Sequence, residues 1–446
     1  MSASDAPVGA DLAAALAAAI ELLRSERLPE AEAALDALLA CWPQQPDALH
    51  YLGVLRHAQG RADDAVTLVR QSLAVAPGNV GAWNNLGNIL LLAQRFDEAA
   101  EAYEASVDAA QGTPEASRAL DNLAVLYRRQ GQAAAAERVA RRAIELNPDD
   151  GDAWYRLSQS LLDQGQVREG LLANSRAVAL WPRHQQARSD VLRALVLLGE
   201  RQRAAALYRE WLDEEPDNPV VQHLLAASSG ESTPERASDA YVEQVFDSFA
   251  ASFDAKLESL NYRAPSLVAQ ALREAVGEPA GDLQIADLGC GTGLCGPLLR
   301  PFAARLAGCD LSVGMLRQAQ ARRAYDQLHK AELGHYLRTQ PDDFDVLVSA
   351  DTLIYFGDLH AVMHDAHTAL RAGGWLIFTV EALAENDPAP LQLQPHGRYA
   401  HRRSHVEQAL AAAGLAPDAI TAETLRTEGG KPVGGWLVRA RKLQHA

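Results

Sequence analysis

The chain has 446 residues, of which 48% are hydrophobic, 22% charged and 6% aromatic, which is the composition of a globular protein of two or three domains. Asp and Glu number 58 against 41 Lys and Arg, so the formal net charge is −17. Both halves are acidic, with 21 basic and 31 acidic residues in 1–228. Because a polyanion meets a repulsive field, the charge argues against nucleic-acid binding.

The N-terminus and the cysteines favour a reducing, aqueous compartment. Acidic residues, Asp5 and Asp11, stand where a signal peptide has a basic segment, and no run of about 20 strongly apolar residues occurs. The cysteines form no C-x-x-C pair and have no His at ligand spacing. Only four of the basic residues are Lys, which is typical of a GC-rich bacterial genome. We expect a cytoplasmic bacterial protein with no membrane segment, no disulfide and no metal site.

An internal repeat comes first in chain order. Prolines recur with gaps of 34, 71, 34 and 34 residues, and the gap of 71 is two units of 34 plus three residues. These prolines are Pro43, Pro77, Pro148, Pro182 and Pro216. Aligning on them gives six units: 12–45, 46–79, 80–113, 117–150, 151–184 and 185–218. The unit 80–113 has Gln111 in place of the closing proline, and the insertion of three residues follows it, so this junction is expected to bend differently.

Each unit reads as two amphipathic helices, with a small residue in the first helix that lets the second approach closely. The period and the Trp-x-x-Leu-Gly pattern at 83–87 resemble the tetratricopeptide repeat. That resemblance implies an all-α superhelical array whose concave face binds a protein or a peptide. An array that serves only as a spacer or a dimerisation element is the alternative. The sequence carries no signature of oligomeric state.

A small, polar stretch at 229–240 is predicted to be the linker between a repeat domain, 1–228, and a second domain, 241–446. The second domain begins with helices over 241–254 and 265–276. Phe246, Phe249 and Phe253 share one face of the first helix, as core residues or as a lid.

Strands and helices then alternate, which predicts an α/β Rossmann-like domain with a doubly wound, mostly parallel sheet. The predicted strands are 283–288, 305–310, 325–330, 344–350, 374–380, 415–425 and 434–440. The predicted helices between them are 294–304, 315–324 and 359–370. The last two strands are joined by a Gly-rich turn and are expected to be antiparallel.

Glycines follow the first strand and an acid ends the second. In such folds the ligand lies over the carboxyl ends of the strands, where glycines let backbone N–H groups approach it without interference from Cβ atoms. Asp310 is placed to accept hydrogen bonds from ribose hydroxyls. The two features together select a nucleoside-bearing cofactor. The segment 291–296 also fits G-x-G-x-x-G, so an NAD-linked oxidoreductase is a rival interpretation.

The full pattern Asp287-Leu-Gly289-Cys-Gly291-Thr-Gly293 resembles motif I of the class I S-adenosylmethionine-dependent methyltransferases, and the resemblance covers about 240–442. It implies a seven-stranded sheet and S-adenosylmethionine as cofactor. In that family the methionine part lies against the positions of Asp287, Gly289, Cys290, Gly291 and Gly293. Asp310 and Leu311 match the ribose-binding position, Glu332 matches an acid that bonds the adenine amino group, and Asp351 matches a position facing cofactor and substrate.

Methyl transfer is an in-line displacement in which the protein mainly positions the acceptor, and it needs a base only if the acceptor loses a proton. Candidate bases are Asp351, His401 and His405, with His396 beside them. Histidines at loop-to-helix junctions are more often pocket or surface residues than metal ligands. We therefore expect a methyltransferase that releases S-adenosylhomocysteine, with an unidentified acceptor. The alternative is a repeat-type adaptor whose cofactor-binding domain has no activity.

Overall fold

The computed structural model describes residues 9–231 and 233–443. The chain divides into two compact units, residues 1–194 and 195–446, which are described separately.

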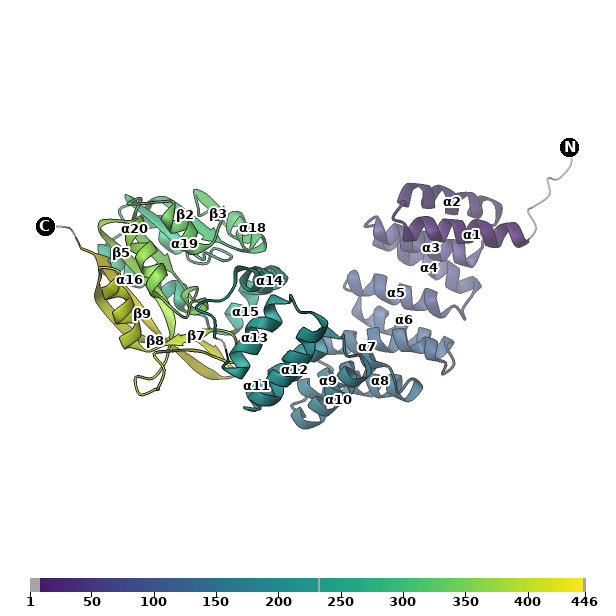
Figure 1. The fold of residues 1–446 in the computed structure, drawn as a ribbon. Helices are drawn as coiled ribbons and strands as arrows, with labels where there is room; N and C mark the ends of the chain where they lie inside the picture. The colour runs from purple at the N-terminus through teal and green to yellow at the C-terminus, as the bar shows by residue number, and fades with distance from the viewer. Residues whose placement is uncertain (1–8, 232, 444–446) are drawn as a thin grey trace. The chain divides into compact units, whose positions relative to one another are not determined.

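The first unit is built of antiparallel helix pairs, one pair to each of the first five predicted repeats (Figure 1). Its helices are α1 (Gly9–Arg24), α2 (Leu28–Cys41), α3 (Pro46–Ala58), α4 (Ala62–Val75), α5 (Val80–Leu92), α6 (Phe96–Ala109), α7 (Ser117–Arg129), α8 (Ala133–Leu146), α9 (Gly151–Asp163) and α10 (Val167–Leu180). The next helix, α11 (Gln185–Leu197), crosses the boundary between the units. The predicted array of helix pairs is confirmed.

A glycine in the first helix of a pair allows the close packing that the sequence indicated. A Cβ atom on Gly87 of α5 would overlap the ring of Tyr103 on α6, and one on Gly53 of α3 would lie 2.6 Å from Val69 Cγ2. Tyr103 is fully buried, and its hydroxyl donates to Asn88 Oδ1 at 2.8 Å. Each pair therefore has its own small core, which neighbouring pairs extend.

The three-residue insertion after the third pair forms a separate turn. The chain leaves α6 through Gln111 and Gly112 in left-handed conformations, with φ of 51° and 78°. A short 3-10 helix, η1 (Pro114–Ala116), then leads into α7. The missing proline and the insertion thus mark a real irregularity in the array.

The second unit begins inside α11 and contains the end of the array as well as the sheet. Its first helices are α12 (Arg201–Glu214), α13 (Pro219–Ser229), α14 (Asp239–Phe249), η2 (Ala250–Ser252), α15 (Phe253–Ser259) and α16 (Ala264–Val276). His223 of α13 stacks on Tyr241 of α14 with ring centroids 4.0 Å apart, and its Nε2 lies 2.9 Å from Gly397 O. The helix α13, which follows the sixth predicted repeat, is therefore packed directly on the sheet-containing part of this unit.

The segment predicted to be a linker is hydrogen-bonded where the structure describes it. Ala237 N donates to Tyr355 O at 2.8 Å, and Gly357 N donates to Glu235 O at 2.8 Å. The two compact units divide at 194/195, within α11. The predicted division of the chain into a repeat domain and a second domain at 229–240 stays a prediction.

The sheet has the order β3-β2-β1-β4-β5-β7-β6, and β9 pairs antiparallel with β5 and with β8. Its strands are β1 (Leu283–Leu288), β2 (Ala303–Asp310), β3 (Gln327–Lys330), β4 (Phe344–Ser349), β5 (Leu370–Ala382), β6 (Leu391–Leu393), β7 (Tyr399–His401), β8 (Leu415–Glu428) and β9 (Lys431–Lys442). The seven predicted strands are present, with the last two antiparallel as predicted. The hairpin β6–β7 was not predicted, since each of its strands has only three residues.

Helices cover both faces of this sheet. The remaining helices are α17 (Gly296–Leu299), η3 (Arg300–Phe302), α18 (Val313–Ala321), α19 (Leu333–Arg338), η4 (Leu353–Tyr355), α20 (His360–Ala369) and α21 (Arg403–Ala412). Alternate strand residues point to opposite faces, so Leu347 packs in a cluster with α19, α20 and α21, and Val346 in one with α16 and α17. The predicted helix over 294–304 was wrong. Only four residues are α-helical, because Pro301 has no N–H to continue the helix, and β2 begins at Ala303.

Among the residues that the structure describes, no helix combines the length and apolar character needed to cross a bilayer.

Candidate active site

Four acidic side chains stand where parallel strands end. Asp287 lies near the end of β1, Asp310 ends β2, Asp351 follows β4, and Glu381 lies near the end of β5. Because these strands are parallel, their carboxyl ends meet along one edge of the sheet. The sequence had identified the first three of these acids, and the structure places them on this common edge.

The glycine loop after β1 is held against the end of β2. The backbone N–H groups of Gly289 and Cys290 both donate to Cys309 O at 2.9 Å. Gly291 N donates to Asp310 Oδ2, also at 2.9 Å. All three glycines have left-handed φ values, 69° at Gly289, 54° at Gly291 and 84° at Gly293. A sharp turn of this kind is accessible to glycine and strained for other residues.

The three glycines serve different purposes. A Cβ atom on Gly289 would overlap Thr352, and one on Gly293 would lie 2.9 Å from the ring of Tyr325. A Cβ atom on Gly291 would meet only Phe253, at 3.9 Å. Gly291 is therefore the glycine that faces the segment α14–α15 without close packing, whereas the other two permit internal packing.

Asp310 is surrounded by backbone donors. Ser312 N donates to Asp310 Oδ1 at 2.8 Å, in addition to the bond from Gly291. Burial raises the pKa of Asp310 above its ordinary value, although these backbone bonds oppose the shift. Leu311, the next residue, is half-buried. Each carboxylate oxygen still has a second lone pair that can accept a hydrogen bond from a ligand.

Glu332 lies near Asp310, because Ala331 N donates to Asp310 O at 3.1 Å. Its two carboxylate oxygens accept from Gly334 N and His335 N, at 2.9 and 2.7 Å, and so cap the N-terminus of α19. The structure thus gives Glu332 a local structural role, and its contact with an adenine group stays a prediction.

Asp287 is almost fully buried, with 1% of its surface exposed. The hydroxyl of Tyr325 donates to its Oδ2 at 2.6 Å. Burial raises the pKa of Asp287 to about 7, in spite of this bond, and the nearby Asp310 adds to the shift. The contact between Asp287 and the methionine part of the cofactor remains a prediction. Cys290 is also buried, which raises the pKa of its thiol and disfavours the reactive thiolate.

The segment α14–α15 lies over the glycine loop and is fixed by two carboxylates, Asp254 to that loop and Asp247 to the start of α18. Asp247 accepts from the Ser312 hydroxyl and, at 3.0 Å, from Gly314 N. Asp254 accepts from the Thr292 hydroxyl at 2.5 Å and pairs with Arg322.

The aromatic rings of this segment form one cluster. The rings of Phe246 and Phe253 have centroids 5.9 Å apart, and Phe246 also meets Tyr355 edge-on at 5.5 Å. Phe249 lies within 6 Å of both phenylalanines. All three phenylalanine rings are half-buried, so they are not part of the deep core.

Asp351 has an unusual backbone conformation for a residue other than glycine, with φ of 54°. Its Oδ1 accepts from the Thr379 hydroxyl at 2.9 Å, and its Oδ2 accepts from Arg426 Nη1 at 2.7 Å. Burial raises its pKa, and the positive charge of Arg426 partly offsets the rise. Thr352 Oγ1 then donates to Gly289 O at 3.1 Å and joins this strand end to the glycine loop.

Asp351 belongs to a group of charged residues, here called the ion cluster, of which the sequence had indicated only Asp351. Its members are Asp351, Glu381, Arg398, Arg426 and Glu428. Arg426 is 4% exposed and pairs with all three acids. An acid near the end of β5 is a signal that could have identified Glu381 from the sequence, whereas Arg426 lies in a strand with several other polar residues and gives no such signal.

The rings of His401 and His405 lie beside the turn at Gly357 and make no hydrogen bond to the ion cluster in the part of the chain that the structure describes. Their rings stack with centroids 5.6 Å apart, and His401 Nε2 lies 3.1 Å from Gly357 O. Burial lowers the pKa of His401 to about 4. These contacts give both rings a structural role, and their catalytic role stays a prediction. Within the described ranges, no three His, Cys, Asp or Glu side chains are grouped as metal ligands.

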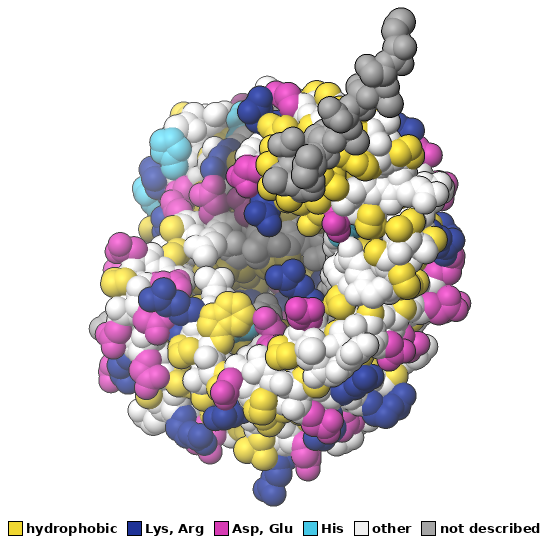
Figure 2. All heavy atoms as spheres, turned by 90° about the vertical axis from the view of Figure 1, so that its right-hand side faces the viewer, with side chains coloured by type: hydrophobic (Ala, Val, Ile, Leu, Met, Phe, Trp, Pro, Cys, Tyr) yellow, Lys and Arg dark blue, Asp and Glu magenta, His cyan; other side chains and the backbone are white. Residues whose placement is uncertain are grey.

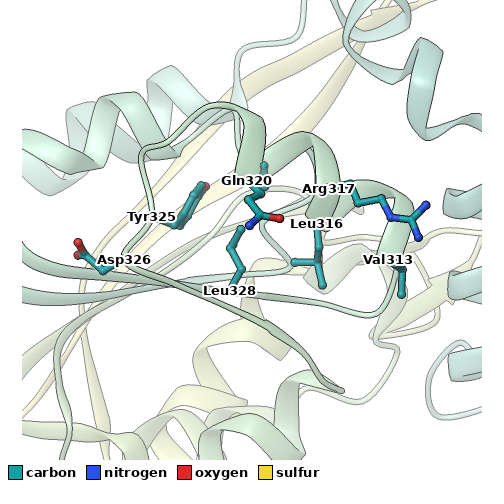
Figure 3. A pocket seen from close by; sticks show the side chains of 8 residues that line it. Val313, Leu316, Arg317, Gln320, Tyr325, Asp326 and Leu328 are labelled. Atoms are coloured by element: carbon teal, nitrogen blue, oxygen red, sulfur yellow. The ribbon is translucent and has the colours of Figure 1, made fainter.

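A separate pocket lies between α18 and the edge strand β3 (Figure 3). Leu316, Gln320 and Leu328 line its middle, with Tyr325 and Asp326 at one end. None of the predicted cofactor-binding residues lines it. Two residues that line this pocket, Ala319 and Tyr325, also pack against Gly293 of the glycine loop, and the Tyr325 hydroxyl donates to Asp287.

Three family models match parts of this chain. Residues 286–378 match the family described as a methyltransferase domain. Residues 16–79, 80–149, 122–182 and 155–219 match tetratricopeptide repeat families. The chain therefore carries tetratricopeptide repeats followed by a methyltransferase domain, as the sequence motifs indicated.

Individual relatives share the second part of the chain. Human methyltransferase-like protein 27 is 37% identical over 110 residues, which are 24% of this chain and 45% of that protein. The biotin biosynthesis bifunctional protein BioHC of Saccharophagus degradans is 32% identical over 181 residues, 36% of this chain and 31% of that protein. The chain thus spans less than half the length of either relative. A solved S-adenosylmethionine-dependent methyltransferase of Mesorhizobium loti is 26% identical over 39% of this chain and 96% of its own, with a TM-score of 0.32.

Proposed function

We propose that this chain, in which tetratricopeptide repeats precede a methyltransferase domain, transfers a methyl group from S-adenosylmethionine to an acceptor. The observation that carries the proposal is the joint placement of Gly291 and Asp310. One carboxylate holds the glycine loop and has lone pairs left at the end of β2, beside Gly291, where a Cβ atom would meet only the ring of Phe253. A nucleoside cofactor needs both features.

The residues present fit this cofactor. Asp310 would accept hydrogen bonds from the ribose hydroxyls, and the backbone at Gly289, Cys290, Gly291 and Gly293 would face the methionine part. Leu311 and Glu332 would lie beside the nucleoside, and Asp287 would balance the ammonium group. When bound, the cofactor supplies a methyl group on a positively charged sulfur, and S-adenosylhomocysteine is the product.

The chain's own residues have three tasks in the reaction. Phe253 and the neighbouring aromatic rings exclude water from above the glycine loop. The ion cluster orients the acceptor at the ends of β4 and β5. Asp351 is placed to accept a proton from the acceptor where one is lost, since burial raises its pKa and makes the carboxylate a better base.

For the repeat array, 1–228, we propose binding of a protein or peptide that brings the acceptor or a partner to the domain at 241–446. Positive and negative side chains are interspersed over the face seen in Figure 2, which suits a protein better than a polyanion. On α5 and α7, Asn122 Nδ2 donates to Asn84 Oδ1 and Asn88 Oδ1 at 3.0 and 3.1 Å. These amides keep further donors and acceptors for an extended main chain.

Two measurements on the full chain test the proposal. Isothermal titration should give saturable binding of S-adenosylmethionine and S-adenosylhomocysteine and none of NADH. Incubation of bacterial cell extract with tritiated cofactor should then give a labelled product. Binding of NADH alone would identify an oxidoreductase. Cofactor binding with no transfer would identify the adaptor.

A further inference from the structure

The ion cluster lies where an acceptor must approach. In the sheet order, β4 and β5 follow β1 on the side opposite to β2, so Asp351 and Glu381 flank the glycine loop on the side away from Asp310. The bond from Thr352 to Gly289 O holds the two parts together. If the ribose lies at Asp310 and the methyl-bearing sulfur over the glycine loop, the acceptor reaches the methyl group along the cluster.

The charges of the cluster do not balance. Its three carboxyl groups face two guanidinium groups, those of Arg398 and Arg426. His396 Nε2 lies 3.6 Å from Glu381 Oε2, but burial and the adjacent Arg398 lower the pKa of His396 to about 4, so it is neutral at pH 7. The cluster therefore has one excess negative charge when its acids are ionised.

Both guanidinium groups already donate hydrogen bonds to these acids. Arg426 donates through Nε to Glu428 at 2.7 Å, through Nη1 to Asp351 at 2.7 Å, and through Nη2 to Glu381. Arg398 donates through Nε to Glu381 at 2.6 Å and through Nη2 to both oxygens of Glu428, at 2.8 and 2.9 Å. An anionic acceptor would have to displace one of these carboxylates and leave it buried without its partner, at a large cost in free energy.

We propose that the methyl acceptor is an uncharged group that carries a proton, a hydroxyl or an amine, and not a carboxylate. This inference rests on the proposed methyltransferase function. The cluster rejects an anion by repulsion, and its carboxylate oxygens accept a hydrogen bond from an O–H or N–H group. The rings of Phe246 and Tyr355, 5.5 Å apart, offer an apolar surface for the body of such an acceptor.

The proposed reaction is balanced. The lone pair of the acceptor oxygen or nitrogen forms the new bond to the methyl carbon, and the carbon–sulfur bond breaks with its electron pair left on sulfur. The acceptor's proton goes to the carboxylate of Asp351 and then to water. A carboxylate acceptor has no proton to lose, so a buried base at this position would only repel it.

The test uses the full chain and the chemistry of its product. Bacterial cell extract is incubated with cofactor tritiated in the methyl group, and the products are treated with mild alkali. Methyl esters of carboxylates are hydrolysed to volatile methanol, whereas methyl ethers and methylamines keep their label. We expect the label to stay non-volatile, at least tenfold above an Asp310→Ala control. Release of most of the label as methanol would overturn the inference while leaving the methyltransferase function intact.

A variant tests the part assigned to Asp351. Asp351→Asn should lower the rate of labelling at least tenfold, while its affinity for S-adenosylhomocysteine stays within threefold of the native value. A native rate would overturn the role of this carboxylate. The alkali test on the native chain decides the acceptor class even if this variant does not fold. If native protein that binds the cofactor transfers no label, both the proposed function and this inference fail.

Discussion

The carboxylate of Asp310 accepts a hydrogen bond from the backbone N–H of Gly291 at 2.9 Å, across 19 residues of sequence. The acid proposed to hold the ribose therefore also fixes the loop proposed to face the methionine part. A change at Asp310 should affect both ends of the cofactor.

We expect Asp310→Ala to weaken S-adenosylhomocysteine binding at least about 30-fold, or about 2 kcal/mol, because it removes a charged hydrogen-bond acceptor and frees Gly291 N. Asp310→Asn keeps an acceptor for Gly291 and should lose less affinity. Isothermal titration measures both, with Asp418→Ala, a partly exposed acid paired with Arg439, as the matched control. Equal affinities for native protein and Asp310→Ala would contradict the site.

Because Gly289 and Gly291 have different neighbours, we expect their substitution by alanine to cause different defects, one in stability and one in cofactor binding. Gly289→Ala forces a Cβ atom into Thr352 and should lower the thermal midpoint of the second unit by several degrees. Gly291→Ala meets only Phe253 at 3.9 Å, so its cost to stability should be about 1 kcal/mol, from its left-handed backbone alone. Its Cβ atom should nevertheless exclude the cofactor. Calorimetric scans and cofactor titrations of the two variants should therefore rank them in opposite orders.

The raised pKa of Asp287 leads us to expect that a proton is released when the cofactor binds. Burial raises its pKa to about 7, so the empty protein holds about half a proton there at pH 7. A bound cation favours the carboxylate and should expel that proton. Titration at pH 7 in buffers of different ionisation enthalpy should detect the release, which Asp287→Asn should abolish.

The raised pKa of Asp287 also makes the stability of the folded protein depend on pH. Because the folded-state pKa of Asp287 lies above its ordinary value of 3.8, this group stabilises the native state below about pH 4, and its contribution is lost as the pH rises through about 7. The empty protein should thus lose stability between about pH 4 and pH 7, and Asp287→Asn should lose less. An equal loss in both proteins would show that other groups set the pH dependence.

The sequence predicted those parts of the fold and site that depend on neighbouring residues. Strands such as 283–288 and 344–350 are short apolar runs followed by glycine or acid, and Asp287, Asp310 and Asp351 lie at their ends. The repeat period was readable because each pair repeats the same packing, as between Gly87 and Tyr103.

Contacts between distant segments were not predictable in this way. Arg426 meets Asp351 across 75 residues and Glu381 across 45, and both pairings depend on how β8 lies relative to β4 and β5. Tyr325 reaches Asp287 across 38 residues. The strands of β6–β7 are too short to give a period, and Pro301 ended a helix that the apolar pattern continued.

The hydrogen bond between Asp254 and Thr292 holds the segment α14–α15 over the glycine loop. We therefore expect this segment to control the access of the cofactor to the loop. Asp254→Ala removes the 2.5 Å contact with Thr292 and the pairing with Arg322, so this segment should open more often. Hydrogen exchange should become faster in 246–259 and stay unchanged in β4. Cofactor dissociation should become faster, whereas Glu258→Ala, an exposed acid on the same segment, should behave like native protein.

The ion cluster predicts a large stability effect from a single side chain. Arg426→Met leaves Asp351, Glu381 and Glu428 close together with only Arg398 to neutralise them, which should cost about 3 kcal/mol or more. Arg439→Met is the control, because Arg439 pairs with the partly exposed Glu274 and Asp418 and should cost about 1 kcal/mol or less from lost charge. Native-state hydrogen exchange of the β4 and β5 amides reports the free energy of opening in this part of the unit.

Adding Glu381→Gln to Arg426→Met removes one of the unpaired carboxylates and should restore part of the loss in stability. If it restores none, the repulsion among the three acids is not the cause, and the charge argument for an uncharged acceptor loses its physical basis.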